Sequence, residues 1–117
     1  MKKVWLAILM IGIAALLYLF LFDRGKIGDS LIIITDDGFQ PSNISVKKDS
    51  RVTFRNEGKN DHWPASDNHP TGDLYPEFDP KKPISPGSSW SFTFLKTGEW
   101  GFHDHFHPEV RGVIIVQ

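Results

Sequence analysis

The chain has 117 residues, of which 40% are hydrophobic and 23% are charged, and its formal net charge is −1. This length is typical of one small domain with an accessory segment, and the near-neutral charge excludes a strongly basic nucleic-acid-binding protein. The absence of cysteine excludes disulfides, thiolate metal ligands, cysteine nucleophiles, lipoprotein anchoring and haem attachment through Cys-x-x-Cys.

An apolar run occupies the N-terminal part of the chain. Between Val4 and Phe22, a stretch of 19 residues, only Gly12 lies outside the apolar class, and two lysines precede the stretch. A helix of that length spans about 28 Å, close to the hydrocarbon thickness of a bilayer, about 30 Å. Because the run ends in bulky residues instead of a small-x-small cleavage site, we expect an uncleaved transmembrane anchor over residues 1–23. A cleaved signal peptide is the alternative.

Both alternatives export the rest of the chain. The two lysines and the free amine before the run favour a cytoplasmic N-terminus. The short polar segment 24–30 predicts a linker, which leaves residues 31–117 for the domain. We therefore expect a single-pass protein that contacts the membrane through its N-terminal helix and places its domain in the periplasm or outside the cell.

The remainder of the chain shows strand patterns and no helical period. Short runs that are apolar or alternate apolar with polar residues are separated by turn residues, which predicts six or seven short strands. The clearest of these runs are 31–35, 44–46, 52–54, 90–94, 100–102 and 113–116. Such spacing indicates an all-β antiparallel sandwich or barrel.

A long irregular segment interrupts this pattern. Residues 62–83 contain five prolines and no sustained periodicity. Long segments of this kind inside a compact domain are usually functional or disordered. The aromatic residues Trp63, Tyr75 and Phe78 favour an ordered segment.

Histidines are concentrated in the second half of the chain. All five, His62, His69, His103, His105 and His107, lie between residues 62 and 107. Neutral imidazole is the commonest metal ligand in proteins. Because side chains two residues apart on a strand share a face, His103 with His105, or His105 with His107, could chelate one ion. His62 follows the strand that ends at Phe54 and is expected at the same end of the sandwich.

The histidines could also have no metal-binding role. In that case the imidazoles are solvated at the surface, and Asp104 accepts a hydrogen bond from one of them. A hydrolase is disfavoured because the chain has no Gly-x-Ser-x-Gly turn, no cysteine and no His-Glu-x-x-His motif. We therefore do not expect a hydrolase, and a protein without enzymatic activity is favoured over an enzyme.

Several motifs together resemble the cupredoxins, a family of small Greek-key β-sandwiches that bind copper. The similarity covers residues 31–117 and is closest to the amicyanin, pseudoazurin and plastocyanin group. The motifs that carry it are Phe39-Gln40-Pro41, Val52-Thr53-Phe54-Arg55-Asn56 before His62, the Trp90/Phe92/Phe94 strand, Gly98-Glu99-Trp100-Gly101-Phe102-His103, His107-Pro108 and Arg111-Gly112. The resemblance implies a cupredoxin-like fold behind the N-terminal helix.

The resemblance also implies a ligand set that differs from the family pattern. His62 and His107 match the two histidine ligands, but Asp104 stands where the family has its copper-binding cysteine, and Val110 stands where it has the axial methionine. The missing thiolate excludes an ordinary blue-copper site. A set of nitrogen and oxygen ligands suits Cu(II) and would also accept zinc or nickel.

Strand parity leaves two ligand sets open. The resemblance favours His62, Asp104 and His107, which requires Asp104 to point inward with Phe102. The local spacing favours His103 and His105, which then point outward unless the strand bends. In order of expectation, the candidate metal ligands are His62, His107, His105, Asp104 and His103. His69 stays open as a lid, an added ligand or a free side chain.

These observations predict a copper-binding protein of the membrane surface. We expect copper delivery, buffering or slow redox work with a copper-handling or redox partner, and no nucleic-acid partner. A metal-free cupredoxin-like interaction module is the first alternative. A small metalloenzyme with water at an open metal position, and with segment 62–83 as the wall of a cleft, is the second.

Overall fold

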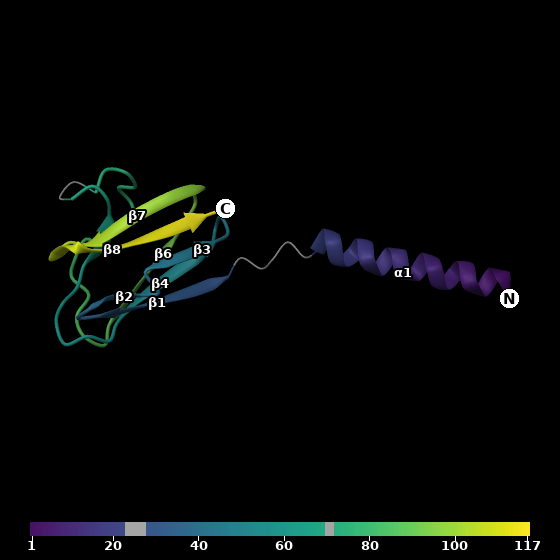
Figure 1. The fold of residues 1–117 in the computed structure, drawn as a ribbon, viewed down its shortest axis with the longest axis horizontal. Coiled ribbons are helices and arrows are strands. Elements are labelled where there is room, and N and C mark those ends of the chain that lie inside the picture. Colours follow the sequence, from purple (N-terminus) through teal and green to yellow (C-terminus); the bar gives the residue numbers. More distant parts are fainter. Residues whose placement is uncertain (23–27, 70–71) are drawn as a thin grey trace.

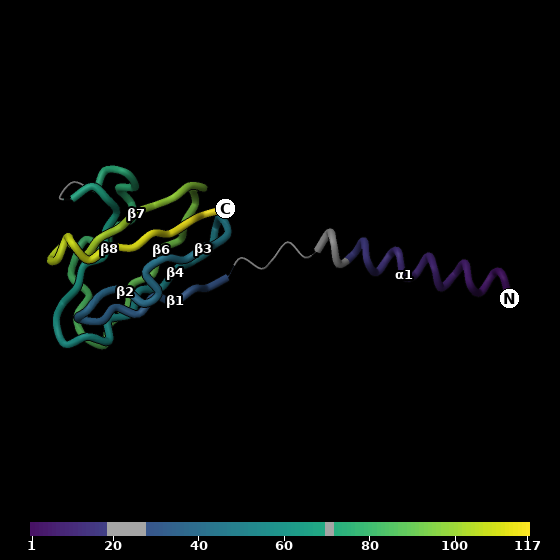
Figure 2. Tube along the Cα trace, viewed as in Figure 1, coloured from purple at the N-terminus to yellow at the C-terminus, as the bar shows by residue number. Residues whose placement is uncertain are grey.

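The computed structural model describes residues 1–22, 28–69 and 72–117, without the side chains of residues 19–22. One helix precedes a sandwich of two sheets (Figure 1, Figure 2). The elements in chain order are α1 (Lys2–Phe22), β1 (Asp29–Thr35), β2 (Gly38–Gln40), β3 (Asn43–Val46), β4 (Arg51–Asn56), β5 (Pro64–Ser66), β6 (Ser89–Thr93), β7 (Gly98–Asp104) and β8 (His107–Val116).

Two four-stranded sheets form a sandwich, which confirms the predicted β-sandwich, but the described residues form eight strands and not the six or seven expected. Their strand orders are β2-β1-β4-β6 and β3-β8-β7-β5. The expectation of purely antiparallel pairing is wrong for two pairs, because β1 runs parallel to β4 and β3 runs parallel to β8. In each of these two pairs, the chain passes through the other sheet between the two strands.

The core lies between the two sheets and is filled by alternate residues of their strands. The period of two places one face of each strand inward. The Phe54 ring on β4 lies 5.6 Å from the Phe102 ring on β7, centroid to centroid, so these two aromatics join the sheets. The largest apolar side chains that are fully buried are Phe54, Phe78, Phe94, Phe102, Ile32, Ile34, Ile114 and Val52.

The proline-rich segment 62–83 is part of this core in its described residues. Its first part forms β5, which pairs antiparallel with β7. Farther along, the side chains of Tyr75 and Phe78 are 2% and 0% exposed, and the Phe78 ring lies 5.0 Å from the Phe94 ring. The prediction that the aromatic residues order this segment is confirmed for these two. The segment therefore adds an edge strand to the sheet that holds β7 and contributes two aromatic side chains to the core.

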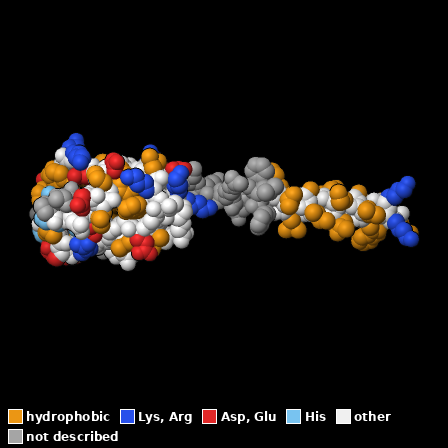
Figure 3. Space-filling model, turned by 90° about the horizontal axis from the view of Figure 1, so that it is seen from above, with side chains coloured by type: hydrophobic (Ala, Val, Ile, Leu, Met, Phe, Trp, Pro, Cys, Tyr) orange, Lys and Arg blue, Asp and Glu red, His pale blue; other side chains and the backbone are white. Residues whose placement is uncertain are grey.

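The N-terminal apolar run forms helix α1, whose described apolar side chains are exposed (Figure 3). Within the described part of the chain, no helix combines the length and apolar character needed to cross a membrane. The prediction of a transmembrane anchor over residues 1–23 is therefore not supported. The predicted linker over residues 24–30 falls mostly on residues 23–27, which lie outside the described residues.

Candidate metal centre

Histidine side chains gather at one end of the sandwich (Figure 3). They come from the loop before β5, the loop after it, the end of β7, the β7–β8 turn and the start of β8. In the described part of the chain they form two groups of ligand-bearing residues. The first, which we call the Asp104 group, is His62, Asp104 and His107; the second, the three-histidine group, is His69, His103 and His105.

Strand alternation at the end of β7 explains why there are two groups. Phe102 points into the core, so Asp104 points inward as well and His103 points to the other face. The β7–β8 ladder shifts register between His103 and Asp104, so the chain bends where the turn begins. His103 is nevertheless 0% exposed, since the Asp67 carboxylate contacts its ring and the His69 ring lies 5.1 Å away.

A buried ion pair forms the centre of the Asp104 group. Asp104 Oδ2 lies 2.6 Å from His62 Nδ1 and 3.4 Å from His107 Nδ1. The other ring nitrogen of His62, Nε2, lies 3.0 Å from Asp36 Oδ1. The second oxygen of Asp104 accepts backbone N–H bonds from Trp63 and Phe106, both at 3.1 Å. Each hydrogen-bonding atom of the His62 and Asp104 side chains therefore has a partner.

Opposing effects set the protonation of this pair. Burial disfavours the charged imidazolium and lowers the pKa of His62, but hydrogen bonds to Asp104 and Asp36 outweigh burial and raise that pKa above its usual value. Burial also opposes charge on Asp104, yet the hydrogen bonds from His62 and the two backbone N–H groups leave the pKa of Asp104 below its usual value. The charged forms of both residues are thus favoured.

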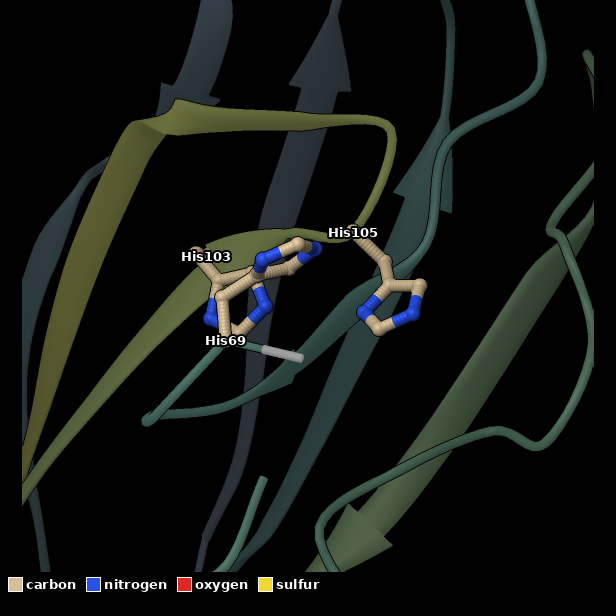
Figure 4. Close-up of side chains that lie close together, drawn as sticks. All are labelled: His69, His103 and His105. Atoms are coloured by element: carbon tan, nitrogen blue, oxygen red, sulfur yellow. The ribbon is translucent and has the colours of Figure 1, made fainter. Parts of the chain in front are cut away.

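The three-histidine group brings imidazoles from a loop, a strand and a turn together (Figure 4). One ring nitrogen of each histidine lies within 4.8 Å of one from each of the others. The His69 ring centroid is 5.1 Å from that of His103 and 4.9 Å from that of His105. His103 is buried, His105 is half-buried and His69 is exposed, so the group reaches from the interior to the surface.

The Asp67 carboxylate fixes the orientation of the His103 ring. His103 Nδ1 lies 2.9 Å from Asp67 Oδ1, and Arg111 donates a hydrogen bond to the other oxygen of Asp67. Gly101 leaves room for this carboxylate, since a Cβ at that position would lie 2.5 Å from Asp67 Oδ2. A carboxylate accepts only, so a neutral His103 carries its proton on Nδ1 and presents a lone pair on Nε2.

Two ring nitrogens in this group lack a partner. Neither His103 Nε2 nor His105 Nδ1, both buried, has a hydrogen-bond partner among the described residues. Leaving a buried polar group unpaired usually costs about 1–3 kcal/mol. Such atoms are rare in folded proteins, and each calls for a physical explanation.

The structure distributes the candidate ligands between the two groups. His62, Asp104 and His107 lie together, while His103 and His105 lie together with His69, which the sequence left open. His105 and His107, an alternative pair on one strand face, belong to different groups because the chain turns between them.

Sequence reasoning missed two carboxylates that contact the histidines. Asp36 begins the sequence Asp36-Asp37-Gly38, which is typical of a turn. Asp67 lies 36 residues before its partner His103. The one available signal for Asp67 is its position two residues before His69 in the proline-rich segment. No local pattern pairs either carboxylate with its histidine.

Comparisons with known proteins agree with this fold. The family model described as a Cupredoxin-like domain matches residues 7–116. The structure of a "Novel Purple Cupredoxin from Nitrosopumilus maritimus" has 22% sequence identity and a TM-score of 0.65, covering 76% of this chain and 100% of that one. No curated protein matches this chain.

Two further solved structures have the same architecture. A reduced amicyanin variant has 20% identity and a TM-score of 0.67, covering 80% of this chain and 87% of that chain. A Cu-containing nitrite reductase from Thermus scotoductus has 21% identity and a TM-score of 0.65, covering 76% of this chain but only 22% of that one. At these identities the likeness establishes the fold alone.

Proposed function

We propose that this chain, which belongs to the cupredoxin-like domain family, binds a transition-metal ion, Cu(II) before others, at the histidine end of its sandwich. One observation carries the proposal: all five histidines of the chain lie in two compact ligand groups at that end. The names of similar structures, among them a Cu(I) form of amicyanin and a Cu-containing nitrite reductase, support copper as the ion.

The donor atoms fit copper without a thiolate. The chain has no cysteine, so a copper–sulfur bond of the blue-copper kind cannot form. Imidazole nitrogens with a carboxylate oxygen suit Cu(II), and they also accept zinc and nickel. The two unpartnered ring nitrogens at His103 and His105 are available as ligand atoms for a metal ion. Bound copper would supply a one-electron redox centre, and the residues of this chain would hold it.

Copper delivery or buffering, or slow redox work with a protein partner, is the role we propose for this site. Sites with only nitrogen and oxygen donors lack the thiolate coupling of blue-copper electron carriers. We propose further that the domain works outside the cytoplasm, which the apolar run behind Lys2 and Lys3 supports. Protease treatment of intact spheroplasts tests this location. We expect the domain to be degraded, and protection of the domain until the spheroplasts are lysed would contradict the proposal.

Metal loading of the full-length chain tests the proposed function. The metal-free chain is titrated with Cu(II), and in parallel with Zn(II) and Ni(II), and the copper form is examined by electron paramagnetic resonance. We expect stoichiometric uptake and a weakly coloured copper signal with nitrogen hyperfine coupling. A chain that folds as a β protein by circular dichroism but takes up none of the three ions would contradict the proposal.

A metal-free interaction module is the second candidate, and the His62–Asp104 contact favours it. This pair occupies the position that resembles the copper site of the family, and its 2.6 Å hydrogen bond needs no ion. In that case a variant with His62 and His107 both changed to alanine would lose stability, and wild type and variant alike would bind no metal. Uptake by the wild-type chain decides against this candidate.

A further inference from the structure

We infer that the metal ion is bound by His69, His103 and His105, and not by the Asp104 group. This inference rests on the proposed function, since it assigns the site within it. Three imidazole nitrogens from three different segments lie within 4.8 Å of one another there. Three features distinguish this group: its free lone pairs, the contacts that hold its rings in place and the route by which an ion reaches them.

Free lone pairs are the first of these features. His103 Nε2 and His105 Nδ1 are buried and have no hydrogen-bond partner among the described residues. His103 is 0% exposed, so no bulk water compensates its Nε2. A metal ion between the rings would satisfy both nitrogens at once, and neutral imidazole is the form that binds metal.

The Asp67 carboxylate prepares His103 as a ligand. Its hydrogen bond from Nδ1, at 2.9 Å, fixes the ring orientation and leaves Nε2 as the acceptor. Metal-binding histidines usually donate their other ring N–H to a carboxylate or carbonyl in this way, which also makes the ligand more basic. Arg111 holds the second oxygen of Asp67, so the carboxylate is itself held from both sides.

The Asp104 group lacks free lone pairs of this kind. Both ring nitrogens of His62 face carboxylate oxygens, at 2.6 Å and 3.0 Å. Both oxygens of Asp104 have hydrogen bonds as well, one with His62 and the other with two backbone N–H groups. An ion at this position would have to break the buried pair, whereas an ion that binds His103 Nε2 and His105 Nδ1 displaces no partner among the described residues.

Exposure gives the ion a route to the three histidines. His103 is buried, His105 is half-buried and His69 is exposed. Three nitrogen donors and no carboxylate ligand favour Cu(II), Zn(II) and Ni(II) over Mg(II) and Ca(II), which prefer oxygen. The chemical class of ligand is therefore a borderline transition-metal cation that enters from the His69 side.

The test compares two exposed histidines, one from each group. The affinities of the full-length chain for Cu(II) and Zn(II) are measured by competition with a chromophoric chelator for wild type, His69→Ala and His107→Ala. Both side chains lie at the surface, so both variants are expected to fold. We expect His69→Ala to weaken binding by at least 10-fold and His107→Ala to change it by less than 2-fold.

The outcomes separate the inference from the proposed function. Wild-type affinity in His69→Ala, or an equal or larger loss in His107→Ala, would overturn the inference while leaving metal binding intact. No binding by wild type would overturn the proposed function itself. Magnesium and calcium serve as negative controls, and displacement of bound copper by either would also overturn the inference.

A second variant tests Asp67 as a positioning residue. Asp67→Asn keeps the size of the side chain but removes its charge, and we expect metal affinity to fall by about 10- to 100-fold. Nitrogen NMR of the metal-free protein reads the tautomer directly, and we expect wild-type His103 to carry its proton on Nδ1. A proton on Nε2 in wild type, or unchanged affinity in Asp67→Asn, would contradict this part of the inference.

Discussion

At the residue scale, the buried Asp104 carboxylate accepts hydrogen bonds at both of its oxygens. One oxygen pairs with His62 and the other accepts two backbone N–H groups at the start of the β7–β8 turn. The side chain is 1% exposed, so its charge depends on these partners. A buried ion pair is weak evidence for stability by itself, but removal of one partner leaves an uncompensated charge. We therefore expect that loss of the Asp104 carboxylate destabilises the turn.

Replacement of Asp104 tests this structural role. We expect Asp104→Asn to lower the free energy of unfolding of the metal-free chain by about 3 kcal/mol, because His62 loses its closest counter-charge. Urea denaturation followed by fluorescence measures the change, and His107→Ala at the same end of the sandwich is the matched control. A loss below about 1 kcal/mol, the usual range for exposed pairs, would contradict a structural ion pair.

Stability of the metal-free chain should depend on pH through the same pair. The pKa of Asp104 is lowered from 3.8, so its contribution is present above pH 3.8 and is lost as the pH falls through the lowered value. The pKa of His62 is raised from 6.5, so its contribution is complete below pH 6.5 and is lost as the pH rises through the raised value. We therefore expect the highest melting temperature between pH 3.8 and pH 6.5, where both contributions are complete.

Thermal melts of the metal-free chain from about pH 3 to about pH 9 measure this profile. Asp104→Asn should flatten it on both sides, because the variant removes the carboxylate and a main cause of the raised His62 pKa. A wild-type melting temperature that climbs steadily as the pH rises above 6.5 would show that His62 gains nothing from protonation.

At the scale of elements, the proline-rich segment does two things. Its β5 strand extends the sheet beyond β7, and the residues that follow β5 supply Asp67 and His69 to the candidate metal centre. Farther along, Phe78 inserts into the core, with its ring 5.6 Å from both Phe54 and Phe102. Anchoring by Phe78 keeps the segment against the sandwich, so core packing and ligand placement are linked.

Truncation of Phe78 tests the anchor. We expect Phe78→Ala to lower the free energy of unfolding by about 3–5 kcal/mol, because it removes a fully buried ring and leaves a cavity. Leu74→Ala, in the same segment but at a side chain that is 54% exposed, is the control and should cost less than about 0.5 kcal/mol. Chemical denaturation compares the two, and equal losses would mean that the segment is not anchored by Phe78.

Strand alternation predicts the longer strands of the fold but not its shortest strands. The runs at 31–35, 52–54 and 90–94 coincide with β1, β4 and β6 or adjoin them closely, because a half-buried strand must alternate. The strands β2 and β5 have three residues each, too few for a period to be visible. Nothing local shows that β5 pairs with the edge of β7.

The sequence predicts which residues of the candidate site carry ligand atoms, but it does not predict which residues they contact. Alternation correctly separates Asp104 from His103 and His105, since neighbouring residues on a strand face opposite sides. It cannot show that His103 is buried, because the cover comes from a segment 36 residues earlier in the chain. His69 stayed open for the same reason: its position depends on the tertiary path of a loop.

At the scale of the whole molecule, one end of the sandwich carries different chemistry on its two faces. The inner face carries the buried ion pair at the β7–β8 turn, and the outer face carries the three-histidine group, in which the ring nitrogens His103 Nε2 and His105 Nδ1 have no partner among the described residues. Both depend on the alternation of His103-Asp104-His105 at the end of one strand. A metal site on the outer face leaves the buried pair intact, so binding and folding need not compete.

The number of imidazoles bound to copper distinguishes the two histidine groups in a single measurement. The full-length chain is loaded with one equivalent of Cu(II), and pulsed electron paramagnetic resonance counts the coordinated histidine rings. We predict three rings in the wild type and two in His69→Ala, with His107→Ala unchanged at three, because the ion is held by His69, His103 and His105. Two rings in the wild type that fall to one in His107→Ala, or no bound copper, would contradict this assignment.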